Sequence, residues 1–410
     1  MRKAGNICVP LKQQARRRGS ILIVALGIMI ILAGLVVTLA HSMGVEAKAS
    51  ANYSAAIQAS AVERGAEQYV IGMLIQLQQE GTTFYDLPDS DFAAVKIGNG
   101  YFWIVRPDYP NDPEFSHYGL VDESAKLNIN YANEAELMAL PDVTQDMADA
   151  ILDWNGQGGN ANNGSYYGTL PTPYQSKQAP FETVEELLLV NGFTRELLYG
   201  QGVATSTGPT IGLGQSAMPT ASINTDPELT TGISDFLTVY SAVAAGTTGT
   251  TGGTGGSTGK AVANGPATPA IASRPRVNVN DAPREVLVAL MEGMGLPDSD
   301  ADSIIAGRNL DDQDTSTVQN ILGNDWSPIQ GYAGGPGNQF SADIVAVSGN
   351  GRAFKRVKIV IDASQTTPTI IYRRDLTSRG WPIDPEILSS LRSGHAIDDA
   401  QDISQAGSSI

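Results

Sequence analysis

The sequence has almost no cysteine and little histidine. Cys8 is the one cysteine among 410 residues, so the sequence offers no intrachain disulfide and no cysteine-based metal centre. The three histidines lie far apart, at positions 41, 117 and 395. The sequence also shows no nucleophile motif, and its Gly/Thr-rich stretch lacks the spacing of a phosphate-binding loop. We therefore expect that the chain is not an enzyme.

Basic residues are also few compared with acidic ones. The chain has 26 basic and 43 acidic residues, which gives a net charge of −17. Phosphate binding is driven by lysine and arginine, so an acidic chain is a poor partner for nucleic acid. The 44 glycines and 22 prolines, with only 17% charged residues, indicate a globular protein with long loops.

One stretch lacks formal charge altogether. Residues 1–19 carry basic residues and no acidic one, and residues 19–45 contain His41 as their only titratable side chain. A membrane helix needs about 20 apolar residues, whereas the apolar core of a signal peptide usually has about 7–15. We expect a retained membrane helix here, with a cleaved signal peptide as the alternative. The basic residues before it place residues 1–18 in the cytoplasm and the chain after Val45 on the other side.

The helical pattern continues beyond the apolar stretch. Residues 46–81 contain no proline, and apolar side chains recur near helical spacing at Ala59, Val62, Ala66 and Leu74. Gly81 is a suitable C-terminal stop. We expect one helix of about 60 residues, half in lipid and half packed on a domain.

A short basic leader that ends in glycine and runs into a half-membrane helix resembles a type IV pilin or a type II secretion pseudopilin. The resemblance implies that a prepilin peptidase cuts after Gly19 and methylates the new N-terminus at Ser20. Most such subunits carry glutamate at the fifth mature position, which here is Val24. A carboxylate in lipid is retained only where it has a partner. The resemblance therefore implies a subunit without a neighbour above it, as in the K-type minor pseudopilin.

An internal repeat lies further along the chain. "KLNINYANEAELMAL" at 126–140 aligns without gaps with "RVNVNDAPREVLVAL" at 276–290, and a second helical run follows each copy. Each copy predicts a short strand, an asparagine near the N-terminus of a helix, and two helices, with Leu137 and Leu140 facing a shared core. The pattern resembles a helix-hairpin-helix (SAM-like) unit. The asparagines that we expect to cap the repeats are Asn128, Asn130, Asn278 and Asn280.

Strand patterns flank this region. Residues 96–108 and 117–130 precede it, and residues 341–347, 352–361 and 369–382 follow it, with "GNG" at 349–351 as a hairpin signal. We predict an α+β fold in which a long N-terminal membrane helix precedes an antiparallel pilin-like sheet that is interrupted by a large α-helical insert. The predicted parts are the leader 1–19, the membrane helix 20–45, its amphipathic continuation 46–81, the first part of the head 82–125, the insert 126–330 with repeats 126–154 and 276–309 and a flexible loop 244–268, the C-terminal strands 331–386 and a disordered tail 387–410.

Two ligand hypotheses arise from the insert. DNA binding by the repeats would require basic glycine hairpins, but the hairpins at 140–146 and 294–302 carry carboxylates and the first has no glycine. Calcium is the one cofactor left open, with acids at helix N-termini as the alternative explanation. The weak calcium candidates are Asp298, Asp300, Asp302, Asp311 and Asp312.

The leader, the missing glutamate and the two repeats together resemble a minor pseudopilin of type II secretion, K type. The resemblance implies a non-enzymatic subunit, anchored once in the inner membrane, that helps to start a pseudopilus from its tip. Implied partners are other minor and major pseudopilins, the prepilin peptidase, the inner-membrane secretion platform and membrane lipid. A minor pilin of a type IV pilus-like system remains an alternative, as does, less readily, a membrane-anchored DNA-uptake protein.

Overall fold

The computed structural model describes residues 18–107, 109, 116–158, 163–200, 232–241, 274–395 and 397. Most of the predicted leader, the predicted flexible loop 244–268 and the chain from residue 398 onward lie outside these residues. The chain divides into two compact units, Met1–Ile57 and Gln58–Ile410, and each is described by itself.

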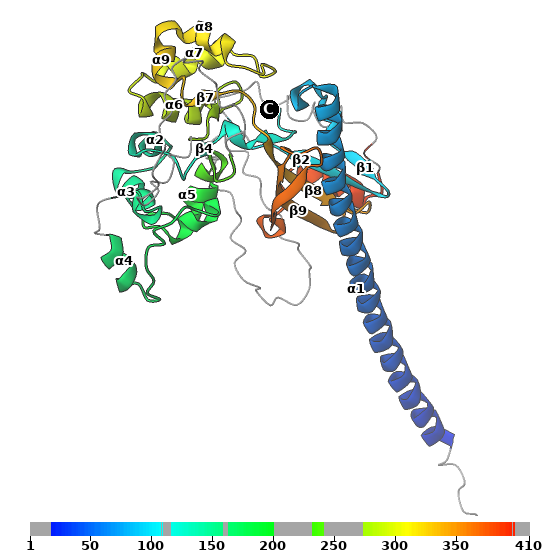
Figure 1. Ribbon diagram of the computed structural model, residues 1–410. Helices are drawn as coiled ribbons and strands as arrows, with labels where there is room; N and C mark the ends of the chain where they lie inside the picture. Colours follow the sequence, from blue (N-terminus) through cyan, green and yellow to red (C-terminus); the bar gives the residue numbers. More distant parts are fainter. Residues whose placement is uncertain are drawn as a thin grey trace, which may run out of the picture. The chain divides into compact units, whose positions relative to one another are not determined.

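The predicted long helix is present as α1, Arg18–Glu80 (Figure 1). It ends where the sequence predicts, because Gly81 adopts a φ of +67°. The amides of Gly81 and Thr82 both donate to the carbonyl of Leu77, so this carbonyl in the last turn of the helix has hydrogen-bond donors. In the first unit, α1 is long and apolar enough to cross a membrane.

An antiparallel sheet forms the head of the second unit, with strand order β1-β2-β8-β9-β10 and β3 paired with β8. Strands from before and after the insert therefore form one sheet, as predicted, because β2 pairs with β8 over Tyr101↔Val347 to Val105↔Asp343. The strands are β1 Val95–Ile97, β2 Gly100–Val105, β3 Val121–Asp122, β8 Gln339–Val347, β9 Phe354–Asp362 and β10 Thr369–Asp375.

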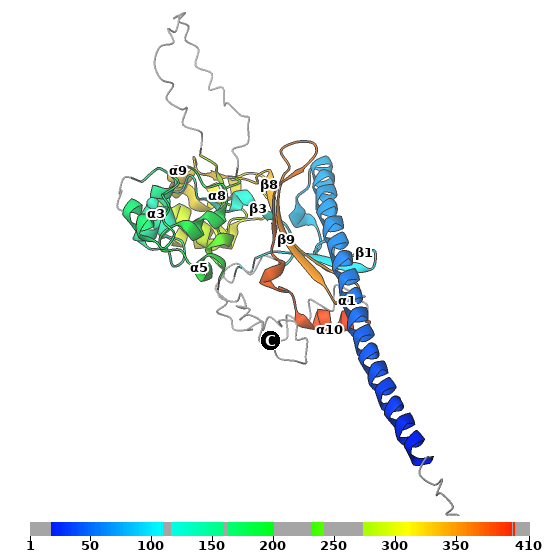
Figure 2. The same cartoon turned by 90° about the horizontal axis from the view of Figure 1, so that it is seen from below.

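The two faces of this sheet are covered by opposite ends of the chain. Val62, Ala66, Val70 and Leu74 of α1 share one core with alternate residues of β2, β8 and β9. Tyr101, Trp103, Val345 and Val347 point to the other face and pack under the C-terminal helix α10, Pro385–Arg392 (Figure 2). The predicted disordered tail is therefore wrong for residues 387–392, because Ile387, Leu388 and Leu391 bury an apolar face on the sheet.

The insert has short helices and two pairs of two-residue strands. In the first repeat β4 pairs in parallel with β5, and in the second β6 pairs in parallel with β7. Because β7 belongs to the second repeat, the insert extends past the predicted boundary at 330. The elements are β4 Leu127–Asn128, α2 Glu134–Met138, α3 Gln145–Trp154, α4 Asn163–Thr169, α5 Arg195–Tyr199, β5 Leu237–Thr238, β6 Val277–Asn278, α6 Arg284–Gly293, α7 Ser299–Gly307, α8 Ser316–Leu322, α9 Trp326–Ile329 and β7 Ala333–Gly334.

Short 3₁₀ helices complete the described part of the chain. They are η1 Phe84–Asp86, η2 Asp89–Asp91, η3 Glu123–Ala125, η4 Val184–Leu189, η5 Ile233–Asp235, η6 Gly323–Asp325 and η7 Thr377–Arg379.

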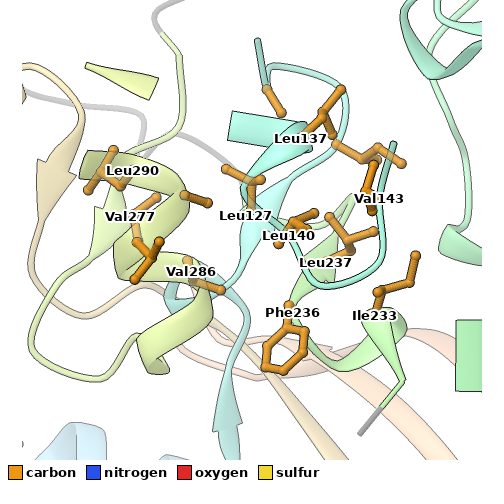
Figure 3. Close-up of a cluster of buried hydrophobic side chains, with 14 of the residues drawn as sticks. Leu127, Leu137, Leu140, Val143, Ile233, Phe236, Leu237, Val277, Val286 and Leu290 are labelled. Carbon is orange, nitrogen blue, oxygen red and sulfur yellow. The ribbon is translucent and has the colours of Figure 1, made fainter. Parts of the chain in front are cut away.

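The two repeats share one hydrophobic core (Figure 3). Leu127, Leu137 and Leu140 of the first repeat and Val286 and Leu290 of the second belong to one cluster, and all are fully or almost fully buried. Helices α2 and α6, which occupy equivalent places in the two copies, are in contact. Each repeat thus has the predicted strand and two helices, while the helix-hairpin-helix assignment stays a prediction.

Candidate functional site

The predicted processing site lies at the beginning of α1. Gly19 and Ser20 fall within its first turn, and Val24 lies about one turn further on with 60% of its surface exposed. Their predicted roles in cleavage, methylation and assembly stay predictions.

The first unit exposes an unbroken apolar surface. Along residues 22–45, large apolar side chains of α1 leave more than half of their surface exposed, among them Leu22, Ile30 and Leu39. A water-soluble chain rarely exposes so extended an apolar surface, and lipid or neighbouring helices are the environments that suit it.

In the second unit, an arginine clamps α1 to the sheet. Arg373 of β10 donates from Nε to Glu67 at 2.7 Å and from Nη2 to Glu63, and both glutamates lie on α1. Glu63 is 1% exposed, and burial together with the hydrogen bond that its protonated form donates to Glu67 raises its pKa, although Arg373 opposes that shift. Arg373 therefore compensates two neighbouring carboxylates on one face of α1 and fixes the position of the helix along the sheet.

The link between head and insert is a buried segment. Every residue from 119 to 129 is buried, including the charged side chains of Asp122, Glu123 and Lys126. Lys126 Nζ lies 2.5 Å from Glu123, which also accepts a hydrogen bond from Thr238 of β5. Burial opposes ionisation of Glu123, yet Lys126 and Lys358 keep its pKa below the usual value. This ion pair joins the head to the first repeat.

Asp122 joins the head to the second repeat. Its carboxylate accepts hydrogen bonds from Ser124, from Asn278 Nδ2 at 3.0 Å and from the Gly337 amide at 2.9 Å. Burial raises the pKa of Asp122, and these donors work against that shift. Because a buried carboxylate without donors is costly, the network holds β6 and the segment before β8 in fixed positions.

The four repeat asparagines form turns and do not cap helices. Asn128 and Asn278 each accept the amide of the residue two positions on, Asn130 and Asn280, and so form the turn that follows the strand. The prediction that these four asparagines cap the helices is wrong, because α2 begins after Asn133 and α6 after Pro283.

Asn130 and Asn280 instead tie each repeat to a later segment. Asn130 exchanges hydrogen bonds with the backbone of Phe181 in both directions, at 2.7 and 3.0 Å. Asn280 donates to the carbonyls of Asp312 and Asp314 at 2.9 and 2.7 Å. Both therefore hold the chain that returns after the second helix of the repeat.

The calcium candidates do not converge. Asp302 pairs with Arg284 at 2.7 Å, and Asp312 accepts from Thr317 and from Asn309. Asp311 accepts from Thr83 at 3.3 Å. Within the described ranges, no group of three or more histidine, cysteine, aspartate or glutamate side chains has an arrangement that could hold a metal ion.

Some contacts that shape this site had no signal in the sequence. Glu63 and Arg373 are 310 positions apart, and Asp122 and Asn278 are 156 apart. A missed signal did exist for the cap of α2, because Asn133 and Glu136 have the spacing of a capping box and form one.

Comparisons with known proteins identify a family resemblance for one part of the chain. The family model described as "Type II secretion system (T2SS), protein K" matches residues 123–199, which include part of the buried link, β4, α2 and α3 of the first repeat, and α5. No curated protein matches the chain at a significant level. A similar solved chain occurs in the GspK–GspI–GspJ complex of the type 2 secretion system from enterotoxigenic Escherichia coli. It is 11% identical, with a TM-score of 0.46 over 80% of this chain and 99% of that one.

Proposed function

We propose that this chain, whose residues 123–199 match the family model for protein K of the type II secretion system, is a minor pseudopilin at the tip of the pseudopilus. The observation that carries the proposal is the buried junction between insert and head. Because Asp122, Glu123 and Lys126 tie both repeats to the sheet, we expect the insert to stay fixed on the head. A subunit with such a fixed insert is hard to bury within a tightly packed shaft, whereas the tip has room for it.

The exposed apolar half of α1 supports an anchor that later packs with other subunits. In this proposal residues 1–18 are cytoplasmic, α1 crosses the inner membrane, and the head and insert are periplasmic. The subunit has no catalytic role, and it starts pseudopilus assembly together with other minor pseudopilins. Val24 supports the tip position, because an apolar residue there needs no positively charged neighbour.

Processing gives the first test. A prepilin peptidase is expected to cut after Gly19, so mass spectrometry of the protein from membranes should find a methylated Ser20 as the N-terminus. Gly19→Leu should leave the leader attached, because a side chain would obstruct a narrow cleft. Gly27→Ala is the matched control, since a Cβ there meets nothing within 4 Å. An intact leader on the unaltered chain would overturn this step.

Assembly gives the second test. The full chain, extracted from membranes, should co-purify with minor pseudopilins of the I and J types, the subunits named in the similar solved complex. Failure to form a complex with any minor pseudopilin, when each subunit is shown to be folded, would contradict the assembly role.

Position in the filament can be tested separately. Val24→Glu should enter the shaft only if the insert is also replaced by a short linker between Ala125 and Gly337. Proximity crosslinking to the major pseudopilin would report shaft positions, and circular dichroism would confirm that the shortened head folds. Free incorporation of the single Val24→Glu variant along the shaft would show that the insert is no barrier.

A further inference from the structure

A pocket of about 330 Å³ opens between the head and the second repeat. This volume is at the lower end of the range for small-ligand sites. Phe84, Phe92, Arg106 and Arg308 are each at most 8% exposed and form its floor. Asp89, Asn309 and Asp311 are exposed and form its rim. Its other lining residues are Tyr85, Leu87, Ser116, Tyr118, Gly119 and Leu310.

The positive charges on the floor are held in fixed positions. Arg106 donates from Nε to the carbonyl of Leu120 at 3.2 Å, and its guanidinium lies 5.4 Å from the centre of the Tyr85 ring. Gly119 makes room for it, because a Cβ there would lie 3.3 Å from Arg106 Nη2. Arg308 donates to the carbonyl of Ala282. A guanidinium has five donors, so a fixed pair of them suits a carboxylate.

The negative charges on the rim are also positioned. Asp89 accepts a hydrogen bond from Ser116 Oγ at 2.7 Å, and Asp311 accepts one from Thr83 Oγ1 at 3.3 Å. Two arginines therefore line the base of the pocket, and two aspartates lie at its mouth. An isolated anion would be repelled at the rim, and an isolated cation would be repelled at the floor.

We propose that this pocket binds the carboxyl-terminal end of a short peptide, with the terminal carboxylate against the two arginines and a positively charged residue near the rim. The final side chain packs on Phe84 and Phe92, so an apolar or aromatic residue is preferred at that position. This inference does not depend on the proposed role at the tip of a filament.

A buried acid lies behind the floor. Asp281 is 5% exposed, and burial raises its pKa to about 7 although Arg106 and Arg308 attract its charge. The other groups that face it are Asp122, which raises the pKa further, and the Tyr85 hydroxyl. Below pH 7 Asp281 is largely neutral, which leaves the arginines with less opposing charge. Carboxylate binding should therefore be tighter near pH 6 than near pH 8.

The test uses the dipeptide Lys-Phe and the full chain in lipid nanodiscs, with isothermal titration calorimetry near pH 6 and empty nanodiscs as the blank. Lys-Phe should bind, and Lys-Phe amide, which lacks the terminal carboxylate, should bind at least about tenfold more weakly. Glu-Phe should also be weaker than Lys-Phe, because its side chain meets the acidic rim. Equal affinity for acid and amide, or no binding of Lys-Phe in the millimolar range, would overturn the proposal.

Variants of the exposed rim residues test the site without changing buried residues on which folding depends. Asp89→Asn with Asp311→Asn should retain binding but lose the preference for Lys-Phe over Glu-Phe. Asp146→Asn, an exposed change in α3 of the first repeat, is the matched control and should leave that preference unchanged. An unchanged preference in the double rim variant would show that the dipeptide binds elsewhere, and would refute this site.

Discussion

In the first repeat Asn130 is held to the backbone of Phe181, whereas in the second repeat the equivalent Asn280 is held to Asp312 and Asp314. The same residue type, at the same place after the same turn, therefore meets different partners. Asn130 uses its side-chain amide both as donor and as acceptor. Asn280 uses only its donor side, and its buried Oδ1 has no hydrogen-bond partner among the residues that the structure describes. The repeated sequence therefore specifies the turn. The segment that follows the second helix of each repeat determines which backbone groups the asparagine side chain binds.

The largest difference should appear when each of these asparagines becomes aspartate. Asn280→Asp places a carboxylate against two carbonyl oxygens at a site with no exposed surface, and should lower the free energy of unfolding by more than about 4 kcal/mol. Asn130→Asp keeps the acceptor for the Phe181 amide and should cost about 1–2 kcal/mol. Urea titration of the full chain in detergent, followed by tryptophan fluorescence, gives both values. Similar losses of unfolding free energy in the two variants would mean that the contacts of Asn130 and Asn280 are equivalent.

The turn asparagines should differ less. Asn278 donates to the buried carboxylate of Asp122, while Asn128 donates to Ser241 Oγ at 2.9 Å. Removing a donor from a buried charged group costs more than removing one from a neutral group. Asn278→Ala should therefore cost about 3 kcal/mol and Asn128→Ala about 1 kcal/mol in the same titration. A larger loss for Asn128→Ala would contradict the anchoring role given to Asp122.

The residues that follow Asn130 and Asn280 differ in charge, and this difference should appear in the pH dependence of stability. Asp281 stands where the first repeat has Tyr131. Burial raises the pKa of Asp281 to about 7 in the folded chain, so folding favours its neutral form. Its stabilising contribution is complete below its unfolded pKa of about 4 and is lost as the pH rises to 7.

The unaltered chain should therefore lose about 2 kcal/mol between pH 5 and pH 7, and Asp281→Asn should remove that slope. Tyr131→Phe, the control in the first repeat, should keep it. The measurement is the urea midpoint at several pH values, and a slope that survives in Asp281→Asn would assign the proton to another group.

Much of the architecture followed from patterns local in the sequence. The apolar run and Gly81 predicted both the type and the end of α1, and the spacing of Leu137 and Leu140 predicted their place in the shared core. These features were predictable because a helix and its buried stripe depend on residues three or four positions apart.

The rest depended on contacts that no local pattern carries, or on signals that were overlooked. β5 and β7 have two residues each, too few for any period to be visible. The Arg373 clamp joins residues from opposite ends of the chain. By contrast, Asp384 before Pro385 is a readable start for α10, and its side chain does accept the amide of Glu386.

The smallest difference between the repeats lies at the beginning of α2 and α6. Asn133 accepts the amide of Glu136 at 2.9 Å and donates its own amide to that glutamate at 2.8 Å, whereas Pro283 at the equivalent position makes no side-chain cap. Asn133→Ala should therefore cost about 1 kcal/mol, and Pro283→Ala less than about 0.5 kcal/mol. The urea midpoints of the two variants show which substitution lowers the stability more. If Pro283→Ala were the more damaging change, the rigid φ of proline would contribute more to the second repeat than the capping box contributes to the first.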